Sequence, residues 1–328
     1  MQSKKLQLAV IGCGAIFENN HLPALINSKI WQLAFLVDND HKRIKQFAAK
    51  SNCGFSVNVK DIPSNIDACL IATPNYLHAQ QSIDLLERGY HVICEKPMAL
   101  NLCEAESVLQ SAKNSNKHYF IVHQKRFQQN VLYLKKHFMA NDIVKAIDIS
   151  LGNKFGWVSR TFFYDSPQKA GGGALLDLGV HLIDLLLSLW DTIEINESFF
   201  STTFKTNPII DTGATCIGTI NKNIPLTLRV SRITTLSNSI KIKYLSHEIE
   251  LSLNDPNQIS IKMNSDCNCK RIDFEITDEK DSFAIYWENV ADVIFENNPI
   301  ANPSKIQDGI EVMRCIESAT EIGEIIIS

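Results

Sequence analysis

The sequence predicts a protein of two α/β domains, the first built on a parallel, doubly wound sheet and the second on antiparallel strands. Three observations lead to this prediction. The length of 328 residues is more typical of two domains than of one. Up to about residue 123, continuously apolar stretches alternate with helical patterns, as expected when helices cover both faces of a parallel sheet. After Asp142 the apolar stretches alternate with polar residues and are separated by turn signals, which is typical of antiparallel strands.

We place the first domain at residues 1–123, with five strands and four helices in alternation. The predicted strands are Leu6–Ile11, Gln32–Val37, Ala68–Ala72, His91–Cys94 and Tyr119–Val122, and the predicted helices are 22–28, 40–50, 76–88 and 102–115. The pattern implies right-handed crossovers between parallel strands, and the carboxyl ends of parallel strands lie at one edge of the sheet. Ligands of open α/β sheets bind outside this edge.

We place the second domain at residues 124–302. Its predicted strands are Ile143–Leu151, Ala214–Ile220, Leu226–Ile233, Ile240–Leu245, Ile249–Leu253 and Arg271–Ile276, and its predicted helices lie near 174–190 and 281–296. A last amphipathic helix is predicted over Ser304–Ile322.

Composition excludes several classes of protein. A formal net charge of −4 provides no general attraction for nucleic acid or for an anionic membrane. Nine cysteines, an odd number without a Cys-x-x-Cys pair, favour free thiols in the cytoplasm over disulfides or a metal site. The apolar stretch 174–190 contains three ionisable residues, so we expect no membrane span. Leu6–Cys13 superficially resembles a lipoprotein signal, but a buried first strand fits the following helical pattern better.

A glycine-containing turn follows the first predicted strand and precedes a helix. It reads Gly12-Cys13-Gly14-Ala15-Ile16-Phe17. The first glycine permits a tight turn, and the second lets the backbone approach a pyrophosphate at the helix N-terminus. Phe17 replaces the third glycine of the usual pattern, and an ordinary strand–helix turn is the alternative interpretation.

Asp38 ends the second predicted strand, where a carboxylate can bind the adenosine ribose hydroxyls and repel a 2′-phosphate. We therefore expect NAD as the cofactor, with NADP still possible because Lys42 and Arg43 are near. The alternative is that Asp38 only caps the following helix.

Two later turns lie at the same predicted sheet edge. Thr73-Pro74-Asn75 leaves the third predicted strand and starts a helix whose first turn carries His78, and we include all four residues among the candidate cofactor contacts. The alternative is that Pro74 and Asn75 are helix start signals and His78 a packing residue. Glu95-Lys96-Pro97 follows the fourth predicted strand, and Pro97 limits the freedom of a turn that presents an ammonium group.

A second polar group lies in the apolar stretch of the second domain. Asp177 and His181 are four residues apart and share one face of a helix. Burying them is costly unless they meet partners, so a structural Asp–His pair is one interpretation. Three glycines at 171–173 allow the backbone to approach something closely, which favours a functional site. A histidine can accept the hydroxyl proton of an alcohol while hydride leaves, and a nearby ammonium stabilises the alkoxide.

These motifs together resemble those of the Gfo/Idh/MocA family, which includes glucose–fructose oxidoreductase and inositol dehydrogenase. The resemblance covers at least residues 5–190, from Leu6–Gly14 through Ala72–Asn75 and Glu95–Pro97 to Gly171–His181. It implies a Rossmann domain, a second α/β domain with an open, mostly antiparallel sheet that forms homodimer or homotetramer contacts, and a helix within 303–328 that returns to the first domain.

The resemblance also implies roles for particular residues. Lys96, Asp177 and His181 become the catalytic set, Glu95 and Lys96 lie near the nicotinamide ribose, and the substrate is a sugar, a sugar derivative or a cyclitol. Arg126 and Arg160 are weaker candidates for substrate recognition, since an arginine whose stem covers aromatic rings is an equally good interpretation.

Two further functions stay open at this point. One is a non-catalytic regulator that senses dinucleotides, although such a protein has no need of a proton acceptor. The other is a glycosidase that uses bound NAD for transient oxidation. The sequence favours an NAD(P)-dependent oxidoreductase acting on a sugar-like alcohol or ketone.

Overall fold

The computed structural model describes residues 5–137, 143–154, 166–202, 210–263, 269–273, 282–295 and 302–327. Its chain forms two compact units. Unit 1 comprises Met1–Val122, Val158–Lys169 and Phe283–Ile310. Unit 2 comprises His123–Trp157, Ala170–Ser282 and Glu311–Ser328. The predicted fold class is confirmed in both units, and each unit is described by itself below.

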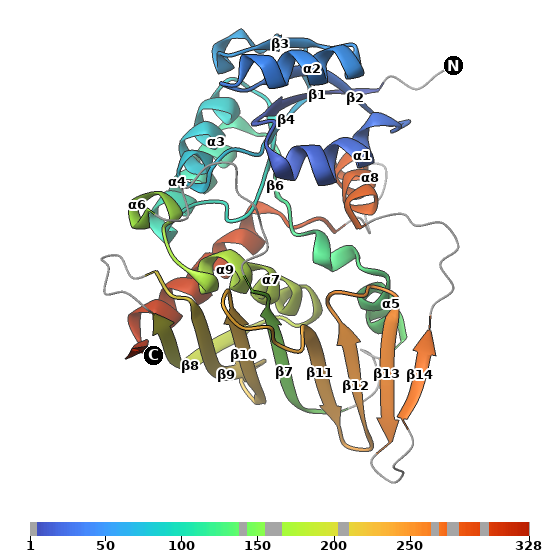
Figure 1. Ribbon diagram of the computed structural model, residues 1–328, viewed down its shortest axis with the longest axis vertical. Coiled ribbons are helices and arrows are strands. Elements are labelled where there is room, and N and C mark those ends of the chain that lie inside the picture. The colour runs from blue at the N-terminus through green and yellow to red at the C-terminus, as the bar shows by residue number, and fades with distance from the viewer. Residues whose placement is uncertain are drawn as a thin grey trace. The chain divides into compact units, whose positions relative to one another are not determined.

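Unit 1 contains a six-stranded parallel sheet in the order β3-β2-β1-β4-β5-β6. The strands are β1 (Leu6–Ile11), β2 (Trp31–Val37), β3 (Gly54–Ser56), β4 (Ala68–Ile71), β5 (His91–Cys94) and β6 (Tyr119–Ile121). The connecting helices are α1 (Leu22–Ile26), α2 (His41–Ser51), α3 (His78–Glu87) and α4 (Leu102–Ser115), with short turns η1 (Phe17–His21), η2 (Val59–Asp61) and η3 (Asn75–Leu77). Helices α3 and α4 pack side by side on one face of the sheet (Figure 1).

The strand register aligns the carboxyl ends of the central strands. Ile11 of β1 lies opposite both Val37 of β2 and Ile71 of β4, and Ile71 lies opposite Cys94 of β5. The four residues are the last of their strands, so the turns that follow them leave from one edge of the sheet. This confirms the shared edge that the strand pattern predicted.

Strand β3 was missed because it has little of a buried strand's pattern. It has three residues at the edge of the sheet, and Gly54 and Phe55 are exposed. Periodicity detects long half-buried or fully buried strands, and a short exposed edge strand gives neither signal.

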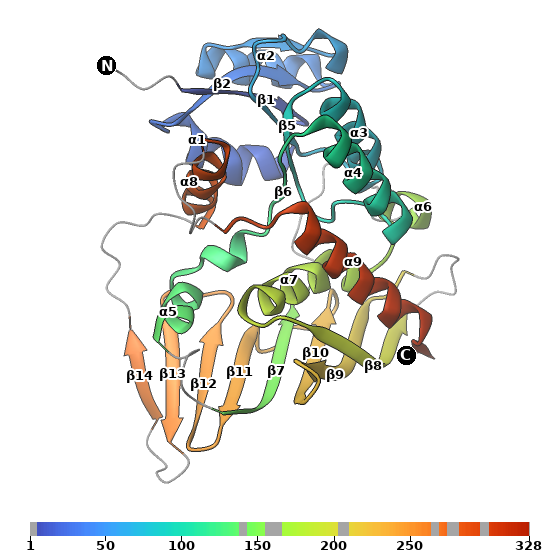
Figure 2. The same ribbon diagram turned by 180° about the vertical axis from the view of Figure 1, so that it is seen from behind.

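Helix α8 (Ser282–Ile294) packs within unit 1, although the sequence placed residues up to 302 in the second domain. The reason is aromatic packing. The indole of Trp31 donates a hydrogen bond to the carbonyl of Trp287 at 2.9 Å, and the two rings pack edge to face at 5.2 Å. Figure 2 shows α8 beside α1. Helix α9 (Ile306–Glu321) begins in unit 1 and continues in unit 2.

Unit 2 contains a nine-stranded sheet in the order β14-β13-β12-β11-β7-β10-β9-β8-β15. Its strands are β7 (Val144–Gly152), β8 (Ile193–Thr202), β9 (Gly213–Ile220), β10 (Ile224–Ser231), β11 (Ser239–Tyr244), β12 (His247–Ser252), β13 (Gln258–Met263), β14 (Cys269–Asp273) and β15 (Glu324–Ile327). Only the pairs β7–β10 and β8–β15 are parallel among these strands. The sheet is therefore mostly antiparallel; β8, β13 and β15 were not predicted.

The helical layer of unit 2 includes the apolar stretch singled out in the sequence. It forms a π-helical turn η6 (Leu175–Gly179) followed by α7 (Val180–Leu189). The remaining helical elements are η4 (Gln124–Phe127), α5 (Gln129–His137) and α6 (Pro167–Ala170). By length and composition Gln168–Leu189 is apolar enough to cross a membrane, but 67% of its most apolar window is buried. It is a core helix, as its ionisable residues indicated.

Truncation of Trp287 tests the attachment of α8 to unit 1. We expect Trp287→Ala to lower the free energy of unfolding by about 3–5 kcal/mol, because it removes a fully buried indole. Phe295→Ala is the matched control, since this aromatic ring just beyond the helix is 40% exposed and should cost far less. Urea denaturation gives both values, and equal losses would contradict the packing role.

Candidate functional site

In the turn after β1, the backbone of a neighbouring turn restricts residue 12 to glycine. Gly12 has φ +91°, and a Cβ there would lie 2.5 Å from the carbonyl oxygen of Ala72 and 2.9 Å from the amide nitrogen of Thr73. A side chain at residue 12 would therefore push apart the turns after β1 and β4. Gly14 differs, because a Cβ there would meet no atom within 4 Å. The backbone at Gly14 is open for close approach by a ligand.

Phe17 explains the missing third glycine. Its side chain is fully buried and packs edge to face on Phe47 of α2 at 5.7 Å. Ala15 and Ile16 are half-buried and directly precede η1, the π-helical segment that starts at Phe17. An aromatic side chain therefore fills the space that a third glycine would leave.

Asp38 connects the ends of β1 and β2. Its Oδ2 accepts the amide N–H of Cys13 at 2.7 Å, and its Oδ1 accepts the amide N–H of Asp40 at 2.8 Å. Each carboxylate oxygen retains a second lone pair for a ribose hydroxyl. The N-cap of α2 is Asp40, whose Oδ1 accepts the amide N–H of Arg43, so helix capping does not explain Asp38. Arg43 also faces both carboxylates, at 3.7 Å from Asp38 and 3.0 Å from Asp40.

His78, which the sequence placed among the candidate cofactor contacts, lies at the start of α3, just after the turn that follows β4. His78 is 1% exposed, and both ring nitrogens contact backbone carbonyls: Nδ1 lies 2.7 Å from Pro97 O and Nε2 lies 2.8 Å from Thr73 O. Both polar atoms of the ring are therefore engaged inside the protein, and direct contact of His78 with the cofactor stays a prediction. Thr73, Pro74 and Asn75 remain at the sheet edge, with the Thr73 hydroxyl donating to Gln81 at 2.7 Å.

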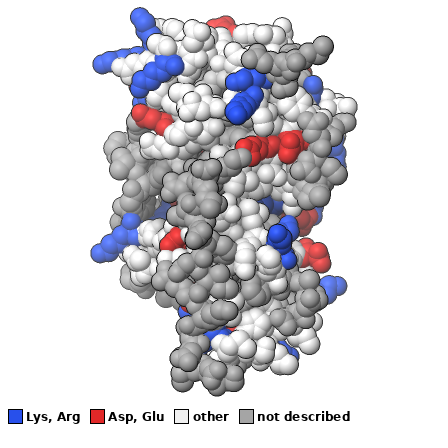
Figure 3. All heavy atoms as spheres, turned by 90° about the vertical axis from the view of Figure 1, so that its right-hand side faces the viewer, with Lys and Arg blue, Asp and Glu red and all other residues white. Residues whose placement is uncertain are grey.

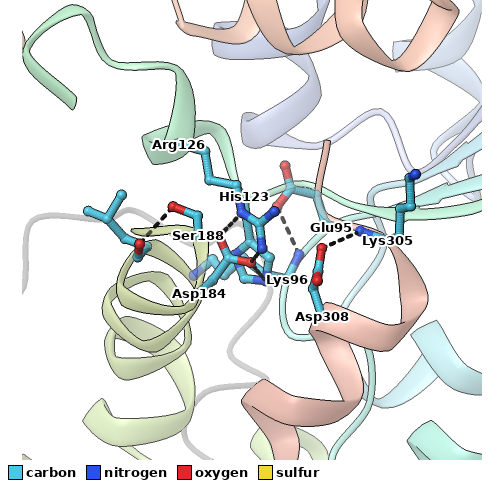
Figure 4. Close-up of polar contacts among 9 residues, drawn as sticks. Glu95, Lys96, His123, Arg126, Asp184, Ser188, Lys305 and Asp308 are labelled. Atoms are coloured by element: carbon cyan, nitrogen blue, oxygen red, sulfur yellow. Dashed lines mark hydrogen bonds and ion pairs between the residues drawn. The ribbon is translucent and has the colours of Figure 1, made fainter. Parts of the chain in front are cut away.

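The turn after β5 presents Lys96 beside a buried carboxylate. Glu95 is 6% exposed; its Oε1 lies 2.8 Å from Nε2 of His21, and its Oε2 accepts the amide N–H of Lys96 at 3.2 Å. His21 is fully buried and packs edge to face on Phe283 and Trp287 of α8. Figure 4 shows Glu95 and Lys96 in this turn. A residue of η1 thus fixes the carboxylate next to the candidate lysine.

The edge of unit 1 fits a dinucleotide. Gly14 leaves open backbone at the start of a helix, where the dipole favours a phosphate. Asp38 offers carboxylate oxygens at the end of the neighbouring strand, and Glu95 and Lys96 leave from the same edge. These positions match the phosphate, ribose and reactive ends of such a ligand.

In unit 2, Asp177 and His181 lie on consecutive turns of the η6–α7 helix. Oδ2 of Asp177 is 3.1 Å from Nη2 of Arg232, a buried residue just after β10. His181 is 8% exposed, and its ring lies 6.0 Å from that of His123 at an angle of 82°. The pair therefore shares one helix face, and the carboxylate is fixed by an ion pair.

The glycine stretch before this helix lies close to another segment of the protein, at Asp211. A Cβ at Gly173 would lie 2.0 Å from the carbonyl oxygen of Asp211. The Asp211 carboxylate accepts the amide N–H groups of Gly173 and Leu175, each at 2.9 Å, and its own carbonyl accepts the N–H of Ala174. Gly171 has φ +76°. The close approach that the sequence suggested is therefore a cap on the helix N-terminus.

Of the two arginine candidates for substrate recognition, the structure describes one, Arg126. Arg126 is 6% exposed and forms a bidentate ion pair with buried Asp184, with Nε–Oδ2 2.7 Å and Nη2–Oδ1 2.6 Å (Figure 4). Arg126 thus neutralises a buried carboxylate that would be costly unpaired, and its role in substrate recognition stays a prediction. Arg160 lies outside the described residues.

Among the described residues, no group of three or more histidines, cysteines or acidic residues could hold a metal ion. The cysteines at 13, 53, 69, 94, 103, 216 and 315 are free thiols. Figure 3 shows basic and acidic side chains interspersed on the face that it presents.

Three residues of this arrangement were missed from the sequence: His21, Asp211 and Arg232. Each acts on a partner far along the chain, so no local spacing links them. The one usable signal is His21 itself, an imidazole in a short segment that follows the glycine turn and would have to be paired if buried.

Comparison with known proteins identifies both parts of the chain. Residues 6–123 match the family described as "Oxidoreductase family, NAD-binding Rossmann fold", and residues 143–250 match the "GFO/IDH/MocA C-terminal domain".

Individual relatives are more distant. Over 196 residues the chain is 28% identical to glucose-6-phosphate 3-dehydrogenase of Bacillus subtilis, covering 58% of this chain and 56% of the relative. Over 185 residues it is 28% identical to an NADP(+) scyllo-inositol 2-dehydrogenase of the same organism, covering 54% of this chain and 56% of the relative. The match thus spans a little over half of each relative. A levoglucosan dehydrogenase in complex with NADH and levoglucosan has a similar fold, with TM-score 0.84, 17% identity and coverage of 97% of this chain and 98% of that one.

The cap formed by Asp211 predicts a pH dependence. Burial raises the pKa of Asp211 from 3.8 to about 6, against the opposing effect of its backbone hydrogen bonds and Arg232. The folded state therefore binds more protons than the unfolded state between these values. The resulting stabilisation is present below the lower value and is lost as the pH rises through the higher one.

We expect the free energy of unfolding of the wild type, relative to Asp211→Asn, to fall by on the order of 2–3 kcal/mol between about pH 4 and about pH 7. The asparagine variant keeps the size of the side chain and removes its titration. Urea denaturation at both pH values measures the difference, and a pH-independent difference would contradict the raised pKa.

Proposed function

Since the chain belongs to the Gfo/Idh/MocA family of oxidoreductases, we propose that it transfers hydride between NAD(P) and a CH–OH or C=O group of a sugar, a sugar derivative or a cyclitol. The observation that carries the proposal is the set of ionisable groups in the two units. Unit 1 presents Lys96 on the sheet edge that also carries Gly14 and Asp38, and unit 2 presents Asp177 and His181 on one helix face.

The cofactor would be held by the edge of unit 1. Backbone amides around Gly14, Ala15 and Ile16 would receive the pyrophosphate, and Asp38 the adenosine ribose. Glu95 and Lys96, with Thr73, Pro74 and Asn75 on the intervening turn, would serve the nicotinamide end. When bound, the nicotinamide supplies the hydride acceptor.

Three side chains would divide the remaining chemistry. His181 accepts the proton of the substrate hydroxyl, because imidazole changes charge near neutral pH. We assign to the ammonium group of Lys96 the stabilisation of negative charge that develops on the substrate. Asp177 orients the substrate or the imidazole, and its ion pair with Arg232 restricts the rotamers from which it does so.

The substrate class is supported by the relatives' names, which include a glucose 6-phosphate and an inositol dehydrogenase. A panel of sugars, sugar phosphates, sugar nucleotides and inositols, assayed by absorbance with NAD and with NADP, tests the proposal. Turnover of one or more members is the expected result. Tight cofactor binding without turnover of any member would favour a dinucleotide-sensing regulator instead, and glycoside cleavage without net NADH would favour an NAD-dependent glycosidase.

Removal of the proton acceptor should affect chemistry rather than cofactor binding. We expect His181→Ala to lower kcat by about 10²–10⁴-fold and to leave the Kd for the dinucleotide nearly unchanged. His247→Ala is the matched control, since His247 also lies in unit 2 and, like His181, is 8% exposed. Steady-state kinetics and fluorescence titration provide the two readouts. A near-normal kcat in the His181 variant would refute the assigned role.

Asp38 should select NAD over NADP. Combining Asp38→Ser with Asn39→Arg removes the carboxylate that repels a 2′-phosphate and adds a cation that binds it. We expect the ratio of kcat/KM for NADP to that for NAD to rise by about tenfold or more. Asn39→Arg alone is the control for added charge. An unchanged ratio in the double variant would count against the ribose contact.

A further inference from the structure

Two turns at the sheet edge of unit 1 are joined by a single buried side chain. The ring of His78, at the start of α3, spans the carbonyl oxygen of Thr73 after β4 and the carbonyl oxygen of Pro97 after β5. The two contacts are 2.8 Å and 2.7 Å long, and the side chain is almost completely buried. Lys96 immediately precedes one end of this link.

The chemistry of the two contacts fixes the charge of the ring. A backbone carbonyl oxygen accepts hydrogen bonds and has no proton to donate. A neutral imidazole carries one N–H and could satisfy only one of these carbonyls, leaving two lone pairs facing each other at the second. Both contacts are favourable only when both ring nitrogens are protonated. The geometry points to a buried imidazolium.

The surroundings of the ring are compatible with a positive charge. The titratable groups near it are Cys94 of β5, which interacts with the ring, and Tyr119 of β6, which interacts with Cys94 and with the hydroxyl of Ser82. Burial alone would lower the pKa of His78, but Cys94 and the two carbonyl groups outweigh it and raise the pKa to about 9. Burial raises the pKa of the Tyr119 phenol, so it stays neutral in this range.

We propose that His78 is a positioning residue whose imidazolium ties the turn 73–75 to the turn 95–97 and so holds Lys96 and the cofactor-binding edge in their working geometry. This inference rests on the proposed function for its catalytic consequence, but the charge state of the ring can be measured without any substrate. A charged donor strengthens each hydrogen bond, and loss of the proton at high pH removes one of the two.

Nitrogen-15 NMR of histidine-labelled wild-type protein tests the charge state. The His78 signals, identified by their loss in His78→Gln, should report two protonated ring nitrogens at neutral pH and deprotonation near pH 9. His91 is the internal reference, because burial and nearby His118 lower its pKa to about 4. Cys94→Ala should shift the His78 titration to lower pH, which also identifies the signals if the glutamine variant does not fold. A neutral His78 ring at neutral pH would overturn the inference.

The positioning role is tested by dinucleotide Kd and kcat measured from neutral to alkaline pH. We expect the dinucleotide affinity of the wild type to fall as the pH rises through about 9, where the His78 ring loses its proton. We expect His78→Gln to raise the Kd and lower kcat/KM by about 10- to 100-fold and to lack this pH-dependent fall. His91→Gln, on the same sheet, should leave both unchanged. Normal values and an unchanged pH profile in His78→Gln would refute the role while leaving the proposed function standing. A wild type that binds neither dinucleotide would refute the proposed function, whatever the NMR result.

Discussion

The parallel register of four strands is the constraint on which the rest of unit 1 depends. Ile11, Val37, Ile71 and Cys94 end their strands at one level because each pairs with its neighbour in register. The chain must turn away at this level, and the residues of those turns lie together although they are far apart in sequence. No side chain has to be attracted to the edge, because backbone hydrogen bonding places the turns there.

Close contact between these turns limits which residues can occupy them. Gly12 is required because the chain after β4 passes where a side chain would be, and Gly173 in unit 2 is required because Asp211 lies against it. In both cases the glycine is explained by the protein's own backbone. Gly14 is the contrasting case, since the space beside it is open. A glycine in a motif therefore signals close approach, and the structure is needed to tell a neighbouring segment from a ligand.

Much of the fold was predictable because it depends on local patterns. Strands β1 and β5 and helix α4 have the predicted bounds, since continuous apolar runs and helical periodicity are readable in sequence. Edge strand β3 was not predictable, because three residues with an exposed Phe55 give no periodic signal. The placement of α8 was not predictable either, because it depends on the distant contact of Trp31 with Trp287. In the candidate site, too, local features were predictable and distant contacts were not. Motifs indicated the residues at the turns, whereas the ion pairs and caps that orient them come from segments that no local spacing connects.

Those distant partners determine how the helix of unit 2 presents its polar face. Asp177, His181 and Asp184 are spaced by four and three residues, so they lie along one side of η6 and α7. Asp177 is bound by Arg232 from the end of β10, and Asp184 is bound by Arg126 from η4. A helix held by ion pairs on both sides of His181 can neither rotate nor slide without leaving a buried carboxylate uncompensated, which is strongly unfavourable. His181 lies between these two ion pairs on the same side, so an otherwise apolar helix acquires one defined polar face.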